Sequence, residues 1–420
     1  MFLQNRNNFI SQMKNNTIAL FYSGVSAFKN GDQKFPFEVN RNFYYLTGIN
    51  QENTILLLIK KNNQTQTFLF ANVSDQLTLL WDGEFLSFKE IAEISQLPLL
   101  NILNILSFNK FLNQKINFIK NYPQEIFKGI YLDLFCLPSE ISINWAFKQF
   151  KFLSNLYPFL KIYNSSSILF YLRKQKKLEE LENIQKALHV NHHALINMIK
   201  NIKKCKYEYQ TDAHYNYYLE KNQTKKSFDT IAACGKNALI LHYNKNNNLL
   251  NKNELLLFDA GVEYKKYSSD ITRCYPISGK FNSFQKQIYN LVLETNKKII
   301  EWVRPYHTFG EFNTYGKDIM AKGLKKIGLF KENTNINQYC YHNFGHHLGL
   351  DLHDLNFSQD DILGENSVVT VEPGLYLPEF NIGIRIEDNI LIKNNGAINL
   401  SQHIPKEIFE IENLMQKFIN

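Results

Sequence analysis

The chain has 420 residues, of which 44% are apolar and 14% aromatic, so it can bury the surface of a globular protein and is long enough for two domains. Its 47 basic and 39 acidic residues give a net charge of +8, but the basic residues are scattered, and the densest short run, RKQKK at 173–177, opens a predicted helix. A nucleic-acid surface needs basic residues gathered on one face, so we expect solvated lysines in this run and no nucleic-acid partner.

The N-terminal segment lacks the continuous apolar core of a signal peptide, and no later run approaches the roughly 20 apolar residues of a membrane span. The five cysteines are dispersed and form no CxxC pair, which argues against a disulfide framework or a thiolate zinc site. They are Cys136, Cys205, Cys234, Cys274 and Cys340. We therefore expect a protein of the reducing cytoplasm with no membrane partner.

Residues 1–165 alternate short apolar runs, such as TILLLI at 54–59 and TFLF at 67–70, with helix-like stretches, a pattern that predicts an α/β domain. No constellation of metal-type ligands occurs in this part of the sequence. A serine-rich stretch, NSSSILF at 164–170, precedes a long helical pattern. We therefore place the domain boundary between residues 165 and 166.

Residues 166–420 are predicted to form a second, α+β domain. Strand-like runs, such as LLLFDAG, SVVTVEPG and GIRIEDNILI, alternate with segments of helical periodicity. These helical segments are near 178–204, 208–222, 283–303 and 310–327. The asparagine-rich stretch NKNNNLLNKN at 244–253 is predicted to be a loop, and the abundance of asparagine and lysine is typical of A/T-rich codon usage rather than of a binding surface.

Carboxylates follow the apolar strands of this second domain. ELLLFDAG places Asp259 where a strand leaves the core, SSDITR supplies Asp270 eleven residues later, and SVVTVEPG places Glu372 directly before a turn. GIRIED alternates so that Arg385 and Glu387 share one face. Taken singly, each acid has an ordinary explanation as a turn residue or a solvated strand residue. The prediction of a metal site therefore depends on their combination.

Together with His346, these four acids have the number and type needed for two divalent cations about 3.5–4 Å apart, bridged by water or hydroxide. A metal-bound water loses its proton near neutral pH, and a second metal can polarise a carbonyl group. Such a site hydrolyses amides without a side-chain nucleophile. Oxygen-rich ligation with one imidazole favours Mn²⁺, with Co²⁺, Zn²⁺ or Fe²⁺ as other occupants.

Four histidines lie in the stretch HNFGHHLGLDLHD at 342–354. The first two, His342 and His346, have the spacing of a zincin helix, but the residues between them lack the required glutamate, and Gly345 and Gly349 oppose a helix. The chain also lacks the glycine patterns of serine hydrolases, P-loops and dinucleotide-binding folds. The site is therefore expected to be built mainly from carboxylates.

The ordered set DAG, SSDITR, HNFGHHLGLDLHD, TVEPGLYLP and GIRIEDN resembles the aminopeptidase P and prolidase family of metallopeptidases, whose catalytic domain has the pita-bread fold. FEVNRNFYYLTGIN at 37–50 and WDGEFL at 81–86 are similar to the N-terminal domain of that family, and NLSQHIPKEIFEIENLM at 399–415 to the end of its catalytic domain. The resemblance thus spans the chain. Trp81 of WDGEFL is expected to be a core aromatic rather than a substrate contact.

The resemblance implies that five residues ligate two metals, with Asp270 and Glu387 bridging them. Glu372 would also handle the proton of the nucleophilic water. The five implied ligands are Asp259, Asp270, His346, Glu372 and Glu387.

The resemblance also implies accessory roles for residues that are not ligands. His242, in CGKNALILHY, matches a histidine of the substrate pocket, and His342 and His353 match histidines that hold substrate and stabilise the tetrahedral intermediate. Arg385 resembles an arginine that supports the site electrostatically. His347 lies at a position that is usually aromatic or apolar, so we expect no chemistry from it.

These observations predict a cytoplasmic metalloaminopeptidase that acts on peptides with proline in the second position. The Xaa-Pro bond is a tertiary amide without an N–H, so peptidases that grip an extended backbone handle it poorly. Two alternatives stay open: a prolidase that cuts only Xaa-Pro dipeptides with the same ligands, and a binding protein on the same fold without catalysis. The resemblance further implies a homodimer or homotetramer.

Overall fold

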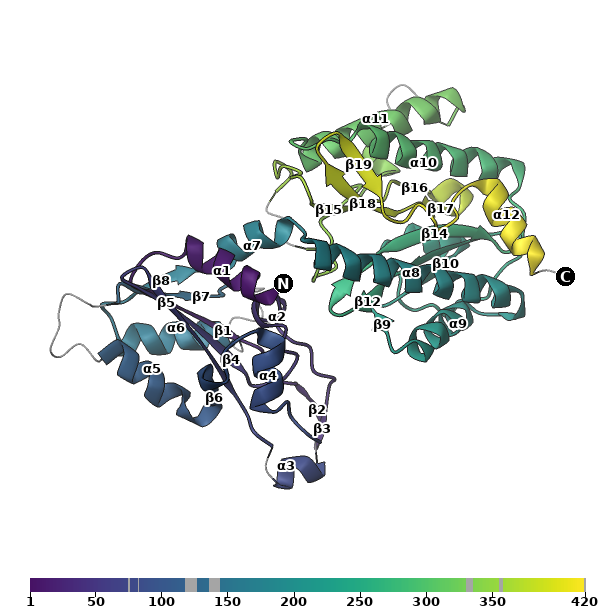
Figure 1. The fold of residues 1–420 in the computed structure, drawn as a ribbon. Coiled ribbons are helices and arrows are strands. Elements are labelled where there is room, and N and C mark those ends of the chain that lie inside the picture. The colour runs from purple at the N-terminus through teal and green to yellow at the C-terminus, as the bar shows by residue number, and fades with distance from the viewer. Residues whose placement is uncertain are drawn as a thin grey trace. The chain divides into compact units, whose positions relative to one another are not determined.

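The computed structural model describes residues 1–74, 76–81, 83–117, 127–135, 144–329, 335–354 and 358–418. The chain forms two compact units, Met1–Leu172 and Arg173–Asn420, whose elements are labelled in Figure 1. The domain boundary predicted between residues 165 and 166 lies at the start of α7 (Ser166–Lys174), whereas the two units divide within this helix, between Leu172 and Arg173. Cys136, and Asp82 of the WDGEFL motif, lie outside the described residues.

The N-terminal unit is built on a six-stranded mixed sheet with the order β6-β5-β4-β1-β7-β8. The central strand β1 pairs antiparallel with β4 and parallel with β7. The predicted strands TILLLI and TFLF form the antiparallel neighbours β4 and β5, so both are confirmed. The strands of this sheet are β1 (Thr17–Tyr22), β4 (Ile55–Lys61), β5 (Gln64–Ala71), β6 (Ile102–Asn104), β7 (Gly129–Leu132) and β8 (Lys161–Asn164).

Helices cover both faces of this sheet. Successive side chains of a strand point to opposite faces, so the buried strands place apolar side chains on both. Leu20 of β1 packs in a buried cluster with Phe108 and Leu153 from two helices. Phe21, the next residue, contacts Phe9 of another helix edge-on, with ring centroids 5.2 Å apart. The helices of this unit are α1 (Phe2–Gln12), α2 (Arg41–Thr47), α3 (Gln76–Trp81), α4 (Phe88–Ser95), α5 (Phe108–Asn117) and α6 (Trp145–Leu156), and a short hairpin joins β2 (Phe28–Asn30) to β3 (Gln33–Lys34).

In the C-terminal unit, strands lie between two helix pairs, α8 with α9 and α10 with α11 (Figure 1). The four helical segments predicted from periodicity are confirmed to within a few residues at each end. The helices are α8 (Leu178–Asn201), α9 (Glu208–Lys221), α10 (Ser283–Trp302), α11 (Phe309–Lys326) and α12 (Ile408–Lys417). No helix in the described part of the chain combines the length and the apolarity needed to cross a bilayer.

Every strand pairing described in this unit is antiparallel, as expected for an α+β domain rather than a βαβ series. The sheets that carry the predicted ligands have the orders β10-β11-β14 and β15-β18-β19, and β16 pairs with β17. Their strands are β10 (Ile231–Cys234), β11 (Leu255–Ala260), β14 (Ile271–Pro276), β15 (Val368–Val371), β16 (Gly374–Leu377), β17 (Ile382–Arg385), β18 (Asp388–Lys393) and β19 (Gly396–Asn399). A further small sheet contains β9 (Lys225–Lys226), β12 (Val262–Tyr264) and β13 (Tyr267–Ser268).

Two expectations about side-chain exposure are wrong. Trp81, at the end of α3, is 74% exposed and is not a core aromatic. The RKQKK run is not a set of solvated cations, because Arg173 is 2% and Lys176 is 5% exposed. Both pair with Asp354, at N–O distances of 2.7 and 3.0 Å. Folding supplies the acidic partner from a distant part of the sequence, which the local composition of the run cannot show.

Candidate active site

Neighbouring strands deliver carboxylates to one place in the C-terminal unit. Asp259 follows four apolar residues of β11, Asp270 directly precedes β14, and Glu387 directly precedes β18. Asp259 lies opposite Thr272 in the β11–β14 pair, and the backbone N–H of Glu387 donates to the carbonyl of Thr272 at 3.1 Å. The side chains therefore emerge together although the sequence separates them by more than a hundred residues.

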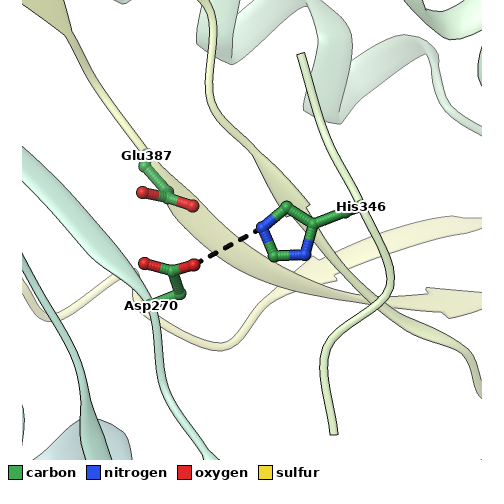
Figure 2. A group of neighbouring side chains, drawn as sticks. All are labelled: Asp270, His346 and Glu387. Atoms are coloured by element: carbon green, nitrogen blue, oxygen red, sulfur yellow. Dashed lines mark ion pairs between the residues drawn. The ribbon is translucent and has the colours of Figure 1, made fainter. Parts of the chain in front are cut away.

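His346 faces this group of acids. Figure 2 shows Asp270, Glu387 and His346 pointing toward one another, and one potential ligand atom from each lies within 4.8 Å of the other two. His346 Nε2 is 3.4 Å from Asp270 Oδ2 and 3.6 Å from Glu372 Oε1. Its Nδ1 lies 2.9 Å from the carbonyl oxygen of His347 and donates to it, so Nε2 is the ring atom that faces the acids.

Two buried carboxylate oxygens in this group, Asp259 Oδ1 and Glu387 Oε1, have no hydrogen-bond partner among the described residues. The other oxygen of each acid is paired: Asp259 Oδ2 accepts from the Arg385 guanidinium at 2.5 Å, and Glu387 Oε2 accepts from the Thr272 hydroxyl at 2.7 Å. A buried anionic oxygen is costly unless a donor or a cation meets it. Carboxylate oxygens with one imidazole nitrogen are a donor set for divalent cations, so these residues fit the metals that the sequence predicts.

Burial is the main cause of the raised pKa values of these acids in the metal-free chain, and repulsion between the acids adds to it. Burial raises the pKa of Asp259 to about 6 and that of Glu372 to about 7. Burial and then the charge of Asp270 raise the pKa of Glu387 well above its ordinary value. Burial alone would lower the pKa of His346, but the hydrogen bond to Asp270 and the charge of Glu372 raise it to about 9. Divalent cations would relieve this repulsion.

Arg385 links several groups of the site. Its guanidinium donates to Asp259 Oδ2, to Thr272 Oγ1 at 3.0 Å and to the Tyr376 hydroxyl at 2.9 Å. The Tyr376 hydroxyl in turn lies 2.9 Å from His342 Nε2. One buried cation therefore sets the positions of a carboxylate, a threonine and a histidine ring.

Three polar residues that the sequence reasoning did not single out belong to this network: Thr272, Thr370 and Tyr376. Thr370 Oγ1 accepts from the backbone N–H of His346 at 3.0 Å and donates to Glu372 Oε1 at 3.4 Å. Each threonine is two positions from an acid of the group, and side chains two apart on a strand share a face. That period could have identified both threonines.

The motif GIRIED does not form one continuous strand. β17 ends at Arg385 and β18 begins at Asp388, and the two residues between them belong to neither strand. The charges of Arg385 and Glu387 nevertheless act on each other, and Ile384 and Ile386 are fully buried, as the predicted alternation requires.

The histidines of the stretch 342–354 have separate environments, and none of the residues 342–350 is helical. The ring of His353 lies 4.1 Å from that of His346, centroid to centroid. His342 Nδ1 is 3.7 Å from Glu372 Oε2. His347 is 1% exposed, lies 3.2 Å from Asp361 and contacts Phe309 with its ring, so it points into the core.

Outside that stretch, His242 is exposed, and its charge acts on His342 and His353. Burial and then Arg385 lower the pKa of His342 to about 3. Partial burial and then His346 lower the pKa of His353 to about 4. Both rings are therefore neutral at pH 7 in the metal-free chain.

Buried charges hold the loop that carries His353. Asp354 is 4% exposed and pairs with both Arg173 and Lys176. A side chain at Gly349 would place its Cβ 2.1 Å from Asp354 Oδ2, so the loop can close on this ion cluster only with glycine there. The RKQKK run thus fixes a loop of the site.

Family models match two parts of the chain: metallopeptidase family M24 over residues 182–394, and the aminopeptidase P N-terminal domain over residues 2–121. The chain belongs to metallopeptidase family M24. The predicted resemblance, the pita-bread catalytic domain and the smaller N-terminal α/β domain are confirmed, and the protein is a metallopeptidase enzyme.

Individual relatives agree with this assignment. A Xaa-Pro aminopeptidase of Haemophilus influenzae is 31% identical over 99% of this chain and 96% of its own length. A Xaa-Pro dipeptidase of Pyrococcus furiosus is 34% identical, over 61% of this chain and 70% of its own. A solved structure from Bacillus anthracis, assigned as an aminopeptidase P, is 35% identical and has a TM-score of 0.94 over 99% of this chain and 98% of that one.

Proposed function

We propose that this metallopeptidase removes the N-terminal residue from peptides that carry proline in the second position, with two divalent cations bound. The supporting observation is the buried group of acids around His346, in which Asp259 and Glu387 keep unpaired oxygens. The substrate class follows from the relative in Haemophilus influenzae, which is similar over nearly the whole chain, whereas the dipeptidase is similar over a smaller part. The proposed ligands are Asp259, Asp270, His346, Glu372 and Glu387.

The bound cations would supply an acidified water and a polarised scissile carbonyl. Glu372 is proposed to take the proton of the attacking water and to pass it to the leaving prolyl nitrogen. A general base must lie within hydrogen-bond reach of the proton that it takes, and Glu372 lies beside His346, with its Oε1 3.6 Å from His346 Nε2.

The accessory residues are proposed to stabilise the oxyanion, bind the peptide and balance the charge of the acids. His353 is proposed to donate a hydrogen bond to the developing oxyanion. Both ring nitrogens of His342 are engaged, Nδ1 by the carbonyl of Asn343 and Nε2 by Tyr376, so we assign this ring to the wall of the peptide site. His242 would contact the peptide from the exposed side, and Arg385 balances the charge of the acids.

Replacing a proposed bridging ligand tests the mechanism directly. Asp270→Asn should reduce the bound metal from two ions per chain and abolish cleavage of Arg-Pro-Pro, measured with elemental analysis of the same sample. Asp212→Asn is the matched control, because that carboxylate pairs with Lys226 at 2.7 Å and is not in the group of acids. Near-normal cleavage by Asp270→Asn at controlled metal content would refute the mechanism. Wild-type protein with neither metal nor cleavage would favour a binding role.

The preference for longer peptides is tested by comparing turnover of Gly-Pro with that of Gly-Pro-Ala. We expect faster turnover of the tripeptide, and activity confined to the dipeptide would assign the protein as a prolidase. The oxygen-rich ligand set favours Mn²⁺, so reconstitution with Mn²⁺ should give a higher rate than Zn²⁺, Co²⁺ or Fe²⁺.

We also propose a cytoplasmic location, supported by the four described cysteines, which are all free thiols. A homodimer or homotetramer is proposed for the assembly, and light scattering of the purified chain tests it.

A further inference from the structure

His242 lies on an irregular segment between β10 and β11. We call residues 235–248 the His242 loop; it begins with a short 3₁₀ helix, Gly235–Leu239. Because the ring of His242 is exposed, its position depends on the conformation of this loop rather than on a surrounding core.

One buried carboxylate joins the two limbs of the His242 loop, which are the part of the chain before His242 and the part after it. Glu208, the first residue of α9, is 0% exposed. Its Oε1 accepts from the backbone N–H of Cys234 at 2.7 Å and from Asn237 Nδ2 at 2.9 Å. Its Oε2 accepts from the Tyr243 hydroxyl at 2.8 Å and from the backbone N–H of Asn248 at 2.9 Å.

The four donors come from different parts of the loop. Cys234 directly precedes the loop, Asn248 is its last residue, Asn237 is in the 3₁₀ helix, and Tyr243 directly follows His242. The two carboxylate oxygens offer about four lone-pair positions, so the donors use the acceptor capacity of Glu208 in full. The backbone N–H of Glu208 also donates to the carbonyl of Asn248 at 3.0 Å. This bond holds the backbone of Glu208 next to the end of the loop that its side chain binds.

A second contact ties the same limb to the sheet. Asn246 is 8% exposed with φ of 45°, and its side chain accepts from Ala232 N–H at 2.9 Å and donates to the carbonyl of Thr230 at 2.7 Å. The limb after His242 is therefore fixed to β10. Glu208 connects this fixed limb to the limb before His242 through four hydrogen bonds, and Asn237 Nδ2 adds a direct bond to the Tyr243 hydroxyl at 3.0 Å.

We propose that Glu208 is a positioning residue of the peptide site: it cross-links the His242 loop and so places His242 where it can contact a bound peptide. The inference rests on the proposed role of His242 in binding the peptide. Glu208 itself touches neither the acids around His346 nor, on this assignment, the substrate.

Glu208→Gln is the most direct test, because it preserves shape while an amide N–H₂ replaces one acceptor oxygen and faces two donors. We expect the KM for Arg-Pro-Pro to rise roughly tenfold or more, with kcat changed less than about threefold and the metal content unchanged. Hydrogen exchange should rise across residues 235–248 and stay constant in β11 and β14. An unchanged KM in a folded variant would overturn the proposal.

Glu180→Gln is a matched control. Glu180 is also a buried glutamate in the first turn of a helix, and it accepts from the Tyr267 hydroxyl at 3.0 Å, but it does not contact the His242 loop. We expect this variant to lose stability without a change in KM. A KM increase equal to that of Glu208→Gln would contradict a specific role for Glu208.

A double-mutant cycle shows whether Glu208 acts through His242. In a His242→Ala background, Glu208→Gln should change kcat/KM by less than about twofold, because the group that it positions is gone. An equal cost in both backgrounds would overturn the proposal. If His242→Ala alone leaves KM unchanged, the proposed role of His242 fails; if His242→Ala raises KM and Glu208→Gln does not, only the positioning role fails.

Tyr243→Phe gives the same test should Glu208→Gln not fold. It removes one of the four donors to Glu208 and also the acceptor of the Asn237 hydrogen bond, and it leaves the ring in place. A KM increase of roughly two- to fivefold supports the proposal, since these two hydrogen bonds of the cross-link are lost, and an unchanged KM overturns it.

Discussion

Thr272 illustrates how single buried residues govern the acids of the site. Its hydroxyl donates to Glu387 Oε2 and accepts from Arg385 Nε, and the residue is fully buried. The threonine therefore bridges a carboxylate and a guanidinium, and the other oxygen of Glu387 has no hydrogen-bond partner among the described residues.

Thr272→Val should lower both stability and activity. The substitution preserves shape but leaves Glu387 Oε2 and Arg385 Nε without their partner, at a cost of about 1–3 kcal/mol. We expect this loss in urea unfolding, together with a fall in kcat/KM of at least roughly tenfold. Thr272→Ser, which retains the hydroxyl, is the control and should stay close to wild type. Equal behaviour of the two variants would refute the role of the hydroxyl.

The ion pair between Lys174 and Asp361 gives a pH-dependent contribution at the same scale. Burial alone would raise the pKa of Asp361, but hydrogen bonds from His347 and Lys174 and the charge of Lys174 lower it. Because the folded pKa is below the unfolded value of about 3.9, the pair stabilises the fold above that pH, and the contribution is lost as the pH falls through the folded pKa.

Lys174→Met should therefore destabilise the protein by about 1 kcal/mol near pH 6 and by less as the pH falls toward 2. Urea unfolding at several pH values measures this difference. Lys393→Met is the control, because Lys393 donates to the neutral side chain of Asn366 at 2.9 Å, and its cost should not follow the titration of a carboxylate. Parallel pH profiles for the two variants would show that Asp361 does not respond to Lys174.

At the scale of elements, glycines let loop and strand approach closely beside the ligands. A Cβ at Gly345 would lie 2.4 Å from the carbonyl oxygen of Thr370 in β15. The backbones of His346 and Thr370 are joined by a hydrogen bond of 2.9 Å from Thr370 N–H to His346 O. The imidazole is therefore placed by main-chain contact with the strand that precedes Glu372.

Gly345→Ala should push the His346 segment away from β15 and weaken metal binding. We expect metal affinity to fall at least roughly tenfold, by analogy with the loss of groups that orient ligands, measured by competition with a chelating dye. Gly364→Ala is the control, since its Cβ would meet Ser367 Oγ at an acceptable 3.5 Å. Wild-type affinity in Gly345→Ala would contradict this account.

At the scale of the whole molecule, the proposed metals belong to one unit only. Ligands that bind the native state stabilise it by mass action, about 2.7 kcal/mol at a hundredfold excess over the dissociation constant. All five proposed ligands lie in Arg173–Asn420, and each compact unit has its own buried sheet.

Removal of metal with a chelator should therefore act locally. Hydrogen exchange is expected to rise in β11, β14 and β18, where unscreened carboxylates repel, and to stay unchanged in β1 and β4. Restoring Mn²⁺ should reverse the effect. Equal protection with and without metal in β11 and β14 would show that the acids do not hold a cation.

The sequence alone predicted the main helices and strands and the residue types of the proposed site. Period-two and helical patterns are local, so they identified β4, β5 and the long helices, and apolar runs that end in an acid placed Asp259 and Glu372 at strand ends. The motif order was sufficient for the family, because its spacing is specific.

Only the tertiary structure decided which polar groups meet. The hydrogen bonds of Glu208 to the His242 loop, the pairing of Arg173 with Asp354 and the contact of Tyr376 with His342 join residues far apart in sequence. Local composition carries no information about such partners, which is why RKQKK was wrongly expected to be solvated and Trp81 to be buried. Hydrogen bonds and ion pairs form over a few ångströms, so their partners are set by how the sheets and loops pack.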